Sequence, residues 1–218
     1  MHKTVNNLLS IQNQLKELDL KILQYPEIIA VSKTFSMDNI EPLIKHGQKH
    51  FGENKIQEAM DKWTDIKNEK PEIKLHMLGK IQTNKVKFLL PLFDYIHSLD
   101  SLKLADKIAS EQIKKNKKTK IFIQVNLANE NQKSGIDKNS LENFYQKCKE
   151  SLDLNIIGLM CLPPINENPE KYFLELKSLA NGLSLEKLSM GMSNDYLKAA
   201  KCGSNYLRIG SNIFGSRS

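Results

Sequence analysis

Lys33 is the residue of this sequence that most favours covalent chemistry. It follows the apolar segment 28–32, which has the pattern of a buried β-strand, and Thr34 begins a loop. A lysine at the end of a buried strand is partly desolvated, which disfavours the ammonium form and makes the amine a nucleophile. Aldehydes react with such an amine to give a Schiff base. The alternative is a side chain that only extends to water at the rim of the sheet, and Lys33 alone does not distinguish the two.

Three small or polar residues near the carboxyl end of the sequence indicate a phosphate site. Ser193 follows a glycine-containing loop and precedes a helical pattern, so we expect it to cap that helix. Gly210 and Ser211 precede a short terminal segment. Helix starts present free N–H groups with partial positive charge, and glycine lets a backbone approach a ligand closely. Two such starts predict a bound phosphate, with two ordinary capped turns as the alternative.

Arginine is rare in this sequence, which makes Arg208 conspicuous. Among the 32 basic residues only Arg208 and Arg217 are arginines, and Arg208 lies in the apolar segment 205–209. Arginine supplies a permanent charge and a planar set of donors that lysine cannot replace. A nucleophilic lysine, a phosphate site and this cation together favour pyridoxal 5′-phosphate (PLP), held as an aldimine on Lys33. Arg208 would then face the pyridine nitrogen and keep it unprotonated, which weakens the ring as an electron sink. A phosphorylated sugar on a Schiff-base lysine is the competing ligand, but it gives Arg208 no role.

Strand-like apolar segments alternate with helical patterns along the chain. Such alternation with short connections is typical of parallel βαβ units. Eight strands and an extra N-terminal helix at 3–22 predict an α/β fold, a single (β/α)8 TIM barrel over residues 1–218, and an open doubly wound sheet is the alternative. The expected strands are 28–32, 50–52, 73–78, 93–97, 120–127, 154–160, 185–189 and 205–209, and the later helices are 38–46, 54–67, 82–91, 101–116, 139–149, 169–181 and 194–202.

A barrel would bring together candidate residues that are far apart in the sequence. In such barrels function lies on the loops at the carboxyl ends of the strands. Lys33 would follow the first strand and Asn54 the second, while Ser193 and Arg208 would lie at the ends of the last two. We therefore expect one site at this end of the barrel.

Composition and charge argue against several other classes of protein. The net charge is +7 and the pI about 9.1, but the lysines are scattered among acidic residues and no arginine–aromatic pattern accompanies them. Nucleic-acid binding is therefore not expected. We see no secretory leader and no apolar stretch of the roughly 18 residues that a membrane span needs. Cys148, Cys161 and Cys202 are widely spaced, which predicts neither disulfides nor a metal site and fits the cytoplasm. We expect a monomer.

Several short motifs occur in the order and spacing of a known family. They are Ala30-Val31-Ser32-Lys33-Thr34, Phe51-Gly52-Glu53-Asn54, His76-Met77-Leu78-Gly79, Gln82-Thr83-Asn84-Lys85, Lys133-Ser134-Gly135, Gly158-Leu159-Met160, Leu188-Ser189-Met190-Gly191-Met192-Ser193 and Arg208-Ile209-Gly210. With these motifs the chain resembles the pyridoxal phosphate homeostasis proteins from about residue 5 to 217. The family fold is a single barrel similar to the N-terminal domain of alanine racemase.

The resemblance implies a PLP-binding protein without catalytic residues or a metal. Such a protein would buffer intracellular PLP or deliver it to PLP-dependent apoenzymes. Lys33 would form the Schiff base and Arg208 would meet the pyridine nitrogen. The other implied cofactor residues are Ser193, Gly210 and Ser211 at the phosphate, and Asn54 and Met192 at the ring.

A small racemase-like PLP enzyme with weak activity is the alternative function. A racemase needs a second base opposite the lysine, which a partner's further domain supplies, and no such domain is expected here. The loop 79–85 departs from the family pattern at Lys80 and Ile81, so its role stays open.

Three further residues are not expected to bind the cofactor. His76 lies in an apolar strand and is interpreted as a core histidine bonded to the backbone, and His50 as a surface residue. Glu53 is expected to pair with a barrel lysine behind the site.

Overall fold

A closed parallel barrel is the architecture of the chain, as the alternating pattern predicts. The computed structural model describes residues 1–18, 20, 25–128 and 134–216. Within these ranges eight parallel strands follow the order β4-β3-β2-β1-β9-β8-β7-β5, and β4 pairs with β5 to close the sheet. A two-residue strand, β6, adds to β5 outside this ring. The strands are β1 (Glu27–Val31), β2 (His50–Glu53), β3 (Lys74–Met77), β4 (Tyr95–Leu99), β5 (Lys120–Asn126), β6 (Ile136–Asp137), β7 (Ile156–Met160), β8 (Lys187–Met192) and β9 (Tyr206–Ile209).

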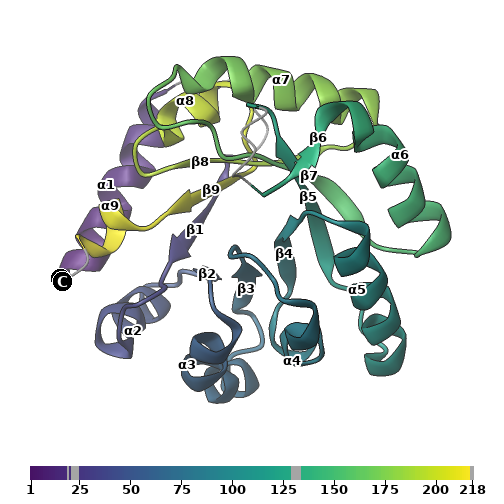
Figure 1. Ribbon diagram of the computed structural model, residues 1–218. Coiled ribbons are helices and arrows are strands. Elements are labelled where there is room, and N and C mark those ends of the chain that lie inside the picture. Colours follow the sequence, from purple (N-terminus) through teal and green to yellow (C-terminus); the bar gives the residue numbers. More distant parts are fainter. Residues whose placement is uncertain (19, 21–24, 129–133, 217–218) are drawn as a thin grey trace.

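Helices surround the strands on the outside of the barrel (Figure 1). The first and the last described helices, α1 and α9, lie side by side, and the Asn7 side chain donates to the carbonyl of Ile213 at 2.9 Å. Among the described residues no helix is both long and apolar enough to cross a bilayer. The helices are α1 (Lys3–Glu17), α2 (Met37–Lys45), α3 (Ile56–Glu69), α4 (Val86–Leu92), α5 (Leu102–Lys115), α6 (Leu141–Gln146), α7 (Pro169–Gly182), α8 (Tyr196–Lys201) and α9 (Ser211–Phe214), with short turns η1 (Thr83–Lys85), η2 (Lys138–Ser140) and the π-helical η3 (Lys147–Ser151).

Several predicted boundaries differ from the observed ones, and two of these differences are informative. The first helix ends at Glu17, where the N–H of Leu18 bonds back to the carbonyl of Leu15, and not at residue 22. Residues 19, 21 and 22 of that prediction lie outside the described residues, as do Lys133 and Arg217.

The end of β8 also differs from the prediction, and this matters for the site. Residues 190–192 belong to the strand, which passes Gly191 with a register shift against β9. Gly191 has φ +91, and a Cβ there would lie 2.5 Å from Cβ of Ala199, so only glycine fits this bulge. The following helix starts at Tyr196, because the Asp195 carboxylate accepts from the N–H of Met192 at 2.6 Å and forms a turn first. Ser193 is therefore not the helix cap that the sequence suggested.

The interior of the barrel contains aromatic and imidazole rings as well as aliphatic side chains. The Tyr95 ring stacks on His76 with ring centroids 4.2 Å apart, and the Phe122 ring stacks on His97 at 4.4 Å. His76 is completely buried, as predicted, but its partners are His50 and His97 rather than the backbone. His50 is half-buried and not a surface residue, because its ring packs inside the end of the barrel where the strands begin.

These buried histidines should make the fold sensitive to acid. Burial holds the pKa of both His76 and His97 well below the usual 6.5, so both stay neutral in the folded protein while the unfolded chain gains protons below that pH. Stability is therefore full above pH 6.5 and lost as the pH falls from there towards the folded pKa values. We expect the free energy of unfolding to fall by up to about 1.4 kcal/mol per pH unit for each histidine.

Urea unfolding at several pH values between 6.5 and 5.5 measures this slope. His76→Phe should reduce it by one histidine's share, whereas His46→Gln, at an exposed position, should leave it unchanged. An identical slope in His76→Phe and the unaltered chain would contradict the assignment.

Candidate functional site

One cavity of about 690 Å³ opens where the strands of the barrel end. Its volume lies in the range of small-molecule sites. The structure brings around it residues from opposite ends of the sequence, including every residue that the sequence assigned to a cofactor. These are Lys33, Asn54, Met192, Ser193, Arg208, Gly210 and Ser211.

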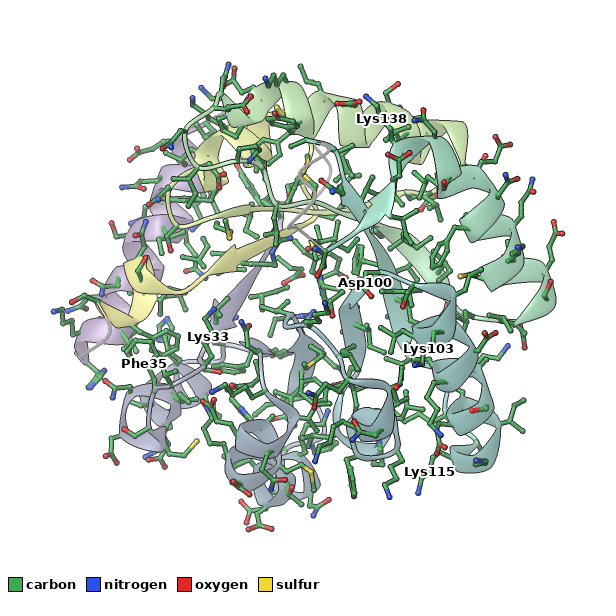
Figure 2. The ribbon with its side chains drawn as sticks, in the orientation of Figure 1. Lys33, Phe35, Asp100, Lys103, Lys115 and Lys138 are labelled. Carbon is green, nitrogen blue, oxygen red and sulfur yellow. The ribbon has the colours of Figure 1, made fainter. Side chains whose placement is uncertain are left out.

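A strained turn holds Lys33 at the cavity. Lys33 is half-buried where β1 gives way to the loop before α2, and Figure 2 labels it there next to Phe35. The next residue, Thr34, has φ +68, which is costly for a β-branched residue. Its N–H donates to the Glu58 carboxylate at 2.5 Å, and the Lys62 ammonium donates to the carbonyl of Ser32 at 2.9 Å. Helix α3 thus fixes the backbone on both sides of Lys33.

A buried ion pair between Glu53 and Lys62 supports the same turn. The fully buried Glu53 carboxylate accepts from the Lys62 ammonium at 2.8 Å. The same oxygen accepts from the Ser32 hydroxyl at 2.7 Å and from the Trp63 indole N–H at 3.0 Å. The expected pairing of Glu53 with a lysine is confirmed. Lys62 itself was missed, although the Glu58–Lys62 spacing of four residues on one helix could have indicated it.

Arg208 is the buried cation of the site. Its guanidinium donates to the Ser189 hydroxyl at 2.5 Å and to the carbonyl of Cys161 at 2.8 Å. Burial lowers the pKa of Arg208 to about 10, so the group remains charged at neutral pH. Sequence reasoning missed Ser189, a small polar residue in an apolar strand. Cys161 is buried, and burial raises the pKa of its thiol to about 12, which makes it unreactive.

The carboxyl-terminal wall of the cavity joins two loops. The backbone N–H of Asn212 donates to the Ser193 hydroxyl at 3.4 Å, and the Asn212 side chain donates to the Ser193 carbonyl at 2.8 Å. This places Ser193 beside Gly210 and Ser211, where α9 begins. A Cβ on Gly210 would meet only Val31, at an ordinary 3.5 Å, so the chain itself leaves room there. A ligand lying against this backbone would account for the glycine.

The loop 79–85 acts on Asn54. A Cβ on Gly79 would lie 2.1 Å from the carbonyl oxygen of Asn54, and the Ser98 hydroxyl donates to the carbonyl of Gly79 at 2.6 Å. Gly79 therefore allows the close approach that keeps Asn54 at the cavity wall.

The chemistry of these groups fits a phosphorylated aromatic aldehyde. The cavity is lined by an amine, a buried cation and two hydroxyls beside Gly210. Its apolar walls include Val31, Leu78 and Met160. Within the described residues no group of three His, Cys, Asp or Glu side chains is arranged to hold a metal ion.

Comparisons with known proteins agree with this geometry. The family model of the alanine racemase N-terminal domain matches residues 7–218. The pyridoxal phosphate homeostasis protein of Aquifex aeolicus is 36% identical over 200 residues, which cover 88% of this chain and 87% of that protein. The protein of the same name from Bos taurus is 35% identical over 91% of this chain and 80% of its own length.

Several solved structures are also similar to this chain. PipY of Synechococcus elongatus without PLP has a TM-score of 0.88 at 30% identity, covering 98% of this chain and 100% of PipY. The structure of PipY with PLP bound has a TM-score of 0.87 at 29% identity, covering 97% of this chain and 100% of PipY. Alanine racemase from Clostridium difficile, with a TM-score of 0.74 at 12% identity, covers 97% of this chain and 57% of that enzyme, and shares the barrel fold.

Removing the Lys62 ammonium should destabilise the protein strongly. Lys62→Met leaves the Glu53 carboxylate buried without its charge partner, which typically costs about 3–5 kcal/mol. The matched control is Lys45→Met, which breaks the exposed Lys45–Glu41 pair and should cost at most about 0.5 kcal/mol. Denaturant unfolding of the two variants compares them, and equal losses would refute the support role of Lys62.

Proposed function

Because this chain belongs to the family of pyridoxal phosphate homeostasis proteins, we propose that it binds PLP in the barrel cavity and takes part in intracellular PLP homeostasis. The observation that carries the proposal is that an amine, a buried guanidinium and two hydroxyls line one cavity. When bound, PLP supplies an electrophilic aldehyde, a phosphate and a ring nitrogen. The protein would hold the cofactor and release it to PLP-dependent apoenzymes in the cytoplasm, acting as a monomer.

Lys33 is the residue that we propose to hold PLP covalently. Its amine would attack the aldehyde carbon, form a C=N bond and release water. The supports on Ser32 and Thr34 keep the backbone of Lys33 in place, so little further ordering would be needed on binding.

The remaining cavity residues would bind the rest of the cofactor. The hydroxyls of Ser193 and Ser211 would donate to the phosphate. Gly210 would let the phosphate approach the backbone closely. Arg208, which stays charged at neutral pH, would donate to the pyridine nitrogen and keep it unprotonated. Asn54 and Met192 would flank the ring.

Holding the cofactor is favoured over turnover. An unprotonated ring nitrogen weakens the cofactor as an electron sink, which suits storage. Two carboxylates among the described residues line the cavity, and both already accept hydrogen bonds from the chain. Asp195 accepts from the N–H of Met192, and Glu167 accepts from the Tyr172 hydroxyl. A weak racemase-like activity is the second candidate, which the barrel shared with alanine racemase favours. Turnover of D- or L-alanine that disappears in Lys33→Ala would establish it.

Borohydride reduction in the presence of PLP should label Lys33. The cavity offers a matched control, since Lys198 also lines it. We expect Lys33→Ala to lose the label and the yellow colour, and Lys198→Ala to keep both. Peptide mapping of the reduced protein identifies the modified lysine. Label on another lysine, or labelling by a sugar phosphate and not by PLP, would overturn the proposal.

Arg208→Lys should retain PLP but shift the absorption of the bound cofactor. A lysine ammonium concentrates its donors on one atom and lacks the planar spread with which the guanidinium reaches Ser189, Cys161 and a ring nitrogen. Visible spectra of the two proteins at saturating PLP measure the shift. An unchanged spectrum would show that Arg208 does not contact the ring nitrogen.

A further inference from the structure

A chain of side-chain hydrogen bonds runs through the barrel interior from Arg208. The Ser189 hydroxyl, which accepts from Arg208, lies 2.8 Å from Nδ1 of His97. Nε2 of His97 lies 2.9 Å from Nδ1 of His76, and Nε2 of His76 lies 2.9 Å from Nδ1 of His50. Each residue comes from a different strand, in the order β9, β8, β4, β3 and β2. We call Ser189, His97, His76 and His50 the histidine relay.

The relay joins the two ends of the barrel. Arg208 lines the cavity, whereas His50 is the first residue of β2, at the opposite end. Beyond His50, its Nε2 faces the Glu27 carboxylate at 3.8 Å, which is an electrostatic contact longer than a direct hydrogen bond. None of the four relay residues lines the cavity.

Only one direction of donation gives a hydrogen-bond partner to every relay atom from the Ser189 hydroxyl to Nδ1 of His50. A guanidinium can only donate, so the Ser189 oxygen accepts from Arg208 and its own proton goes to Nδ1 of His97. His97 then carries its proton on Nε2 and donates to His76, which donates in the same way to His50. The proton on Nε2 of His50 points towards Glu27. The reverse direction would leave the Ser189 proton without an acceptor among the described side chains.

All three imidazoles are neutral in this arrangement. Burial lowers the pKa of His76 and His97, and the charge of Arg208 lowers that of His97 further. Burial also lowers the pKa of His50. The other charged groups that act on His50 are Glu27 and Asp94, which favour its protonated form, and Lys74 and Lys120, which oppose it; the rings of Tyr95 and Tyr206 also face it.

We propose that the histidine relay positions Arg208 for the ring nitrogen of the cofactor, so that a change at His50 alters the bound cofactor across the barrel. The Ser189 oxygen is a directed acceptor for Arg208 only while neutral His97 accepts the Ser189 proton. A doubly protonated His97 would donate to the same oxygen and compete with Arg208 for it. The role at the ring nitrogen rests on the proposed function, whereas the relay itself is a property of the chain.

The first test needs no cofactor. Nitrogen-15 NMR of the histidine rings at pH 7 should show all three as neutral tautomers protonated on Nε2. Ser189→Ala removes the donor to His97 and should change the Nδ1 signal of His97, while exposed His46 stays unchanged. A relay histidine protonated on Nδ1, or charged, would overturn the proposed direction whether or not the protein binds PLP.

The second test measures whether His50, at the end of the relay far from the cavity, affects the affinity and the absorption of bound PLP. His50→Phe breaks the relay outside the cavity, and we expect roughly tenfold weaker PLP binding, the scale for losing a partner that orients a ligand-binding group, together with a shifted absorption. His50→Asn retains an acceptor close to the position of Nδ1 and should restore both. Tyr95→Phe is the packing control, because its ring stacks on His76 but its hydroxyl bonds outside the relay.

The outcomes separate the two proposals. PLP binding with the same affinity and spectrum in His50→Phe as in the unaltered protein would overturn the positioning role and leave the PLP function standing. Equal effects of Tyr95→Phe and His50→Phe would assign the change to packing and also overturn it. Absence of PLP binding in the unaltered protein and in every variant would reject the cofactor proposal and, with it, the role of Arg208 at the ring.

Discussion

A permanently charged guanidinium inside the barrel is the constraint on which the site depends. Arg208 is only 5% exposed, and burying a charge costs a large free energy unless hydrogen bonds and a counter-charge compensate it. Its two nearest partners, the Ser189 hydroxyl and the Cys161 carbonyl, are both neutral. They fix the plane of the guanidinium without cancelling its charge, which leaves a buried cation at the cavity wall. A ligand with a lone pair on a ring nitrogen and a phosphate complements such a cavity.

Lys33 is held in place by charged side chains that contact the backbone of its two neighbours. The turn after β1 is strained at Thr34, and the strain persists because Glu58 and Lys62 hold the backbone on both sides. Lys62 can do so only because Glu53 compensates its charge in the interior. The Lys62 ammonium bonds to the Glu53 carboxylate and the Ser32 carbonyl, whereas Lys33 lines the cavity. The ion pair thus serves the placement of a backbone segment rather than stability alone.

Patterns that repeat along the chain were readable from the sequence, and contacts across the barrel were not. Alternating strands and helices gave the barrel, and the ends of those strands gave the residues around the cavity, because both depend on local order. Ser189 and Lys62 were missed since their contacts depend on how one element packs on another: Ser189 on β8 bonds to Arg208 on β9, and Lys62 on α3 pairs with Glu53 on β2. The role of Ser193 as a helix cap was wrong because Gly191 continues β8 through a bulge, a conformation that depends on packing against Ala199. The resemblance to a family indicated the proposed cofactor residues, but it gave no role to His76, which lies in one of its motifs, or to His97.

Closure of the sheet is what makes the interior polar chain possible. His97 on β4 and Ser189 on β8 are in contact at 2.8 Å, although β3, β2, β1 and β9 separate their strands along one side of the sheet. In an open doubly wound sheet these side chains would lie far apart, and the imidazoles would have no successive partners. In the closed barrel the two buried histidines, His76 and His97, each have a hydrogen-bond partner at both ring nitrogens, so they are satisfied without any charge. The relay therefore adds no positive charge to the interior next to Arg208.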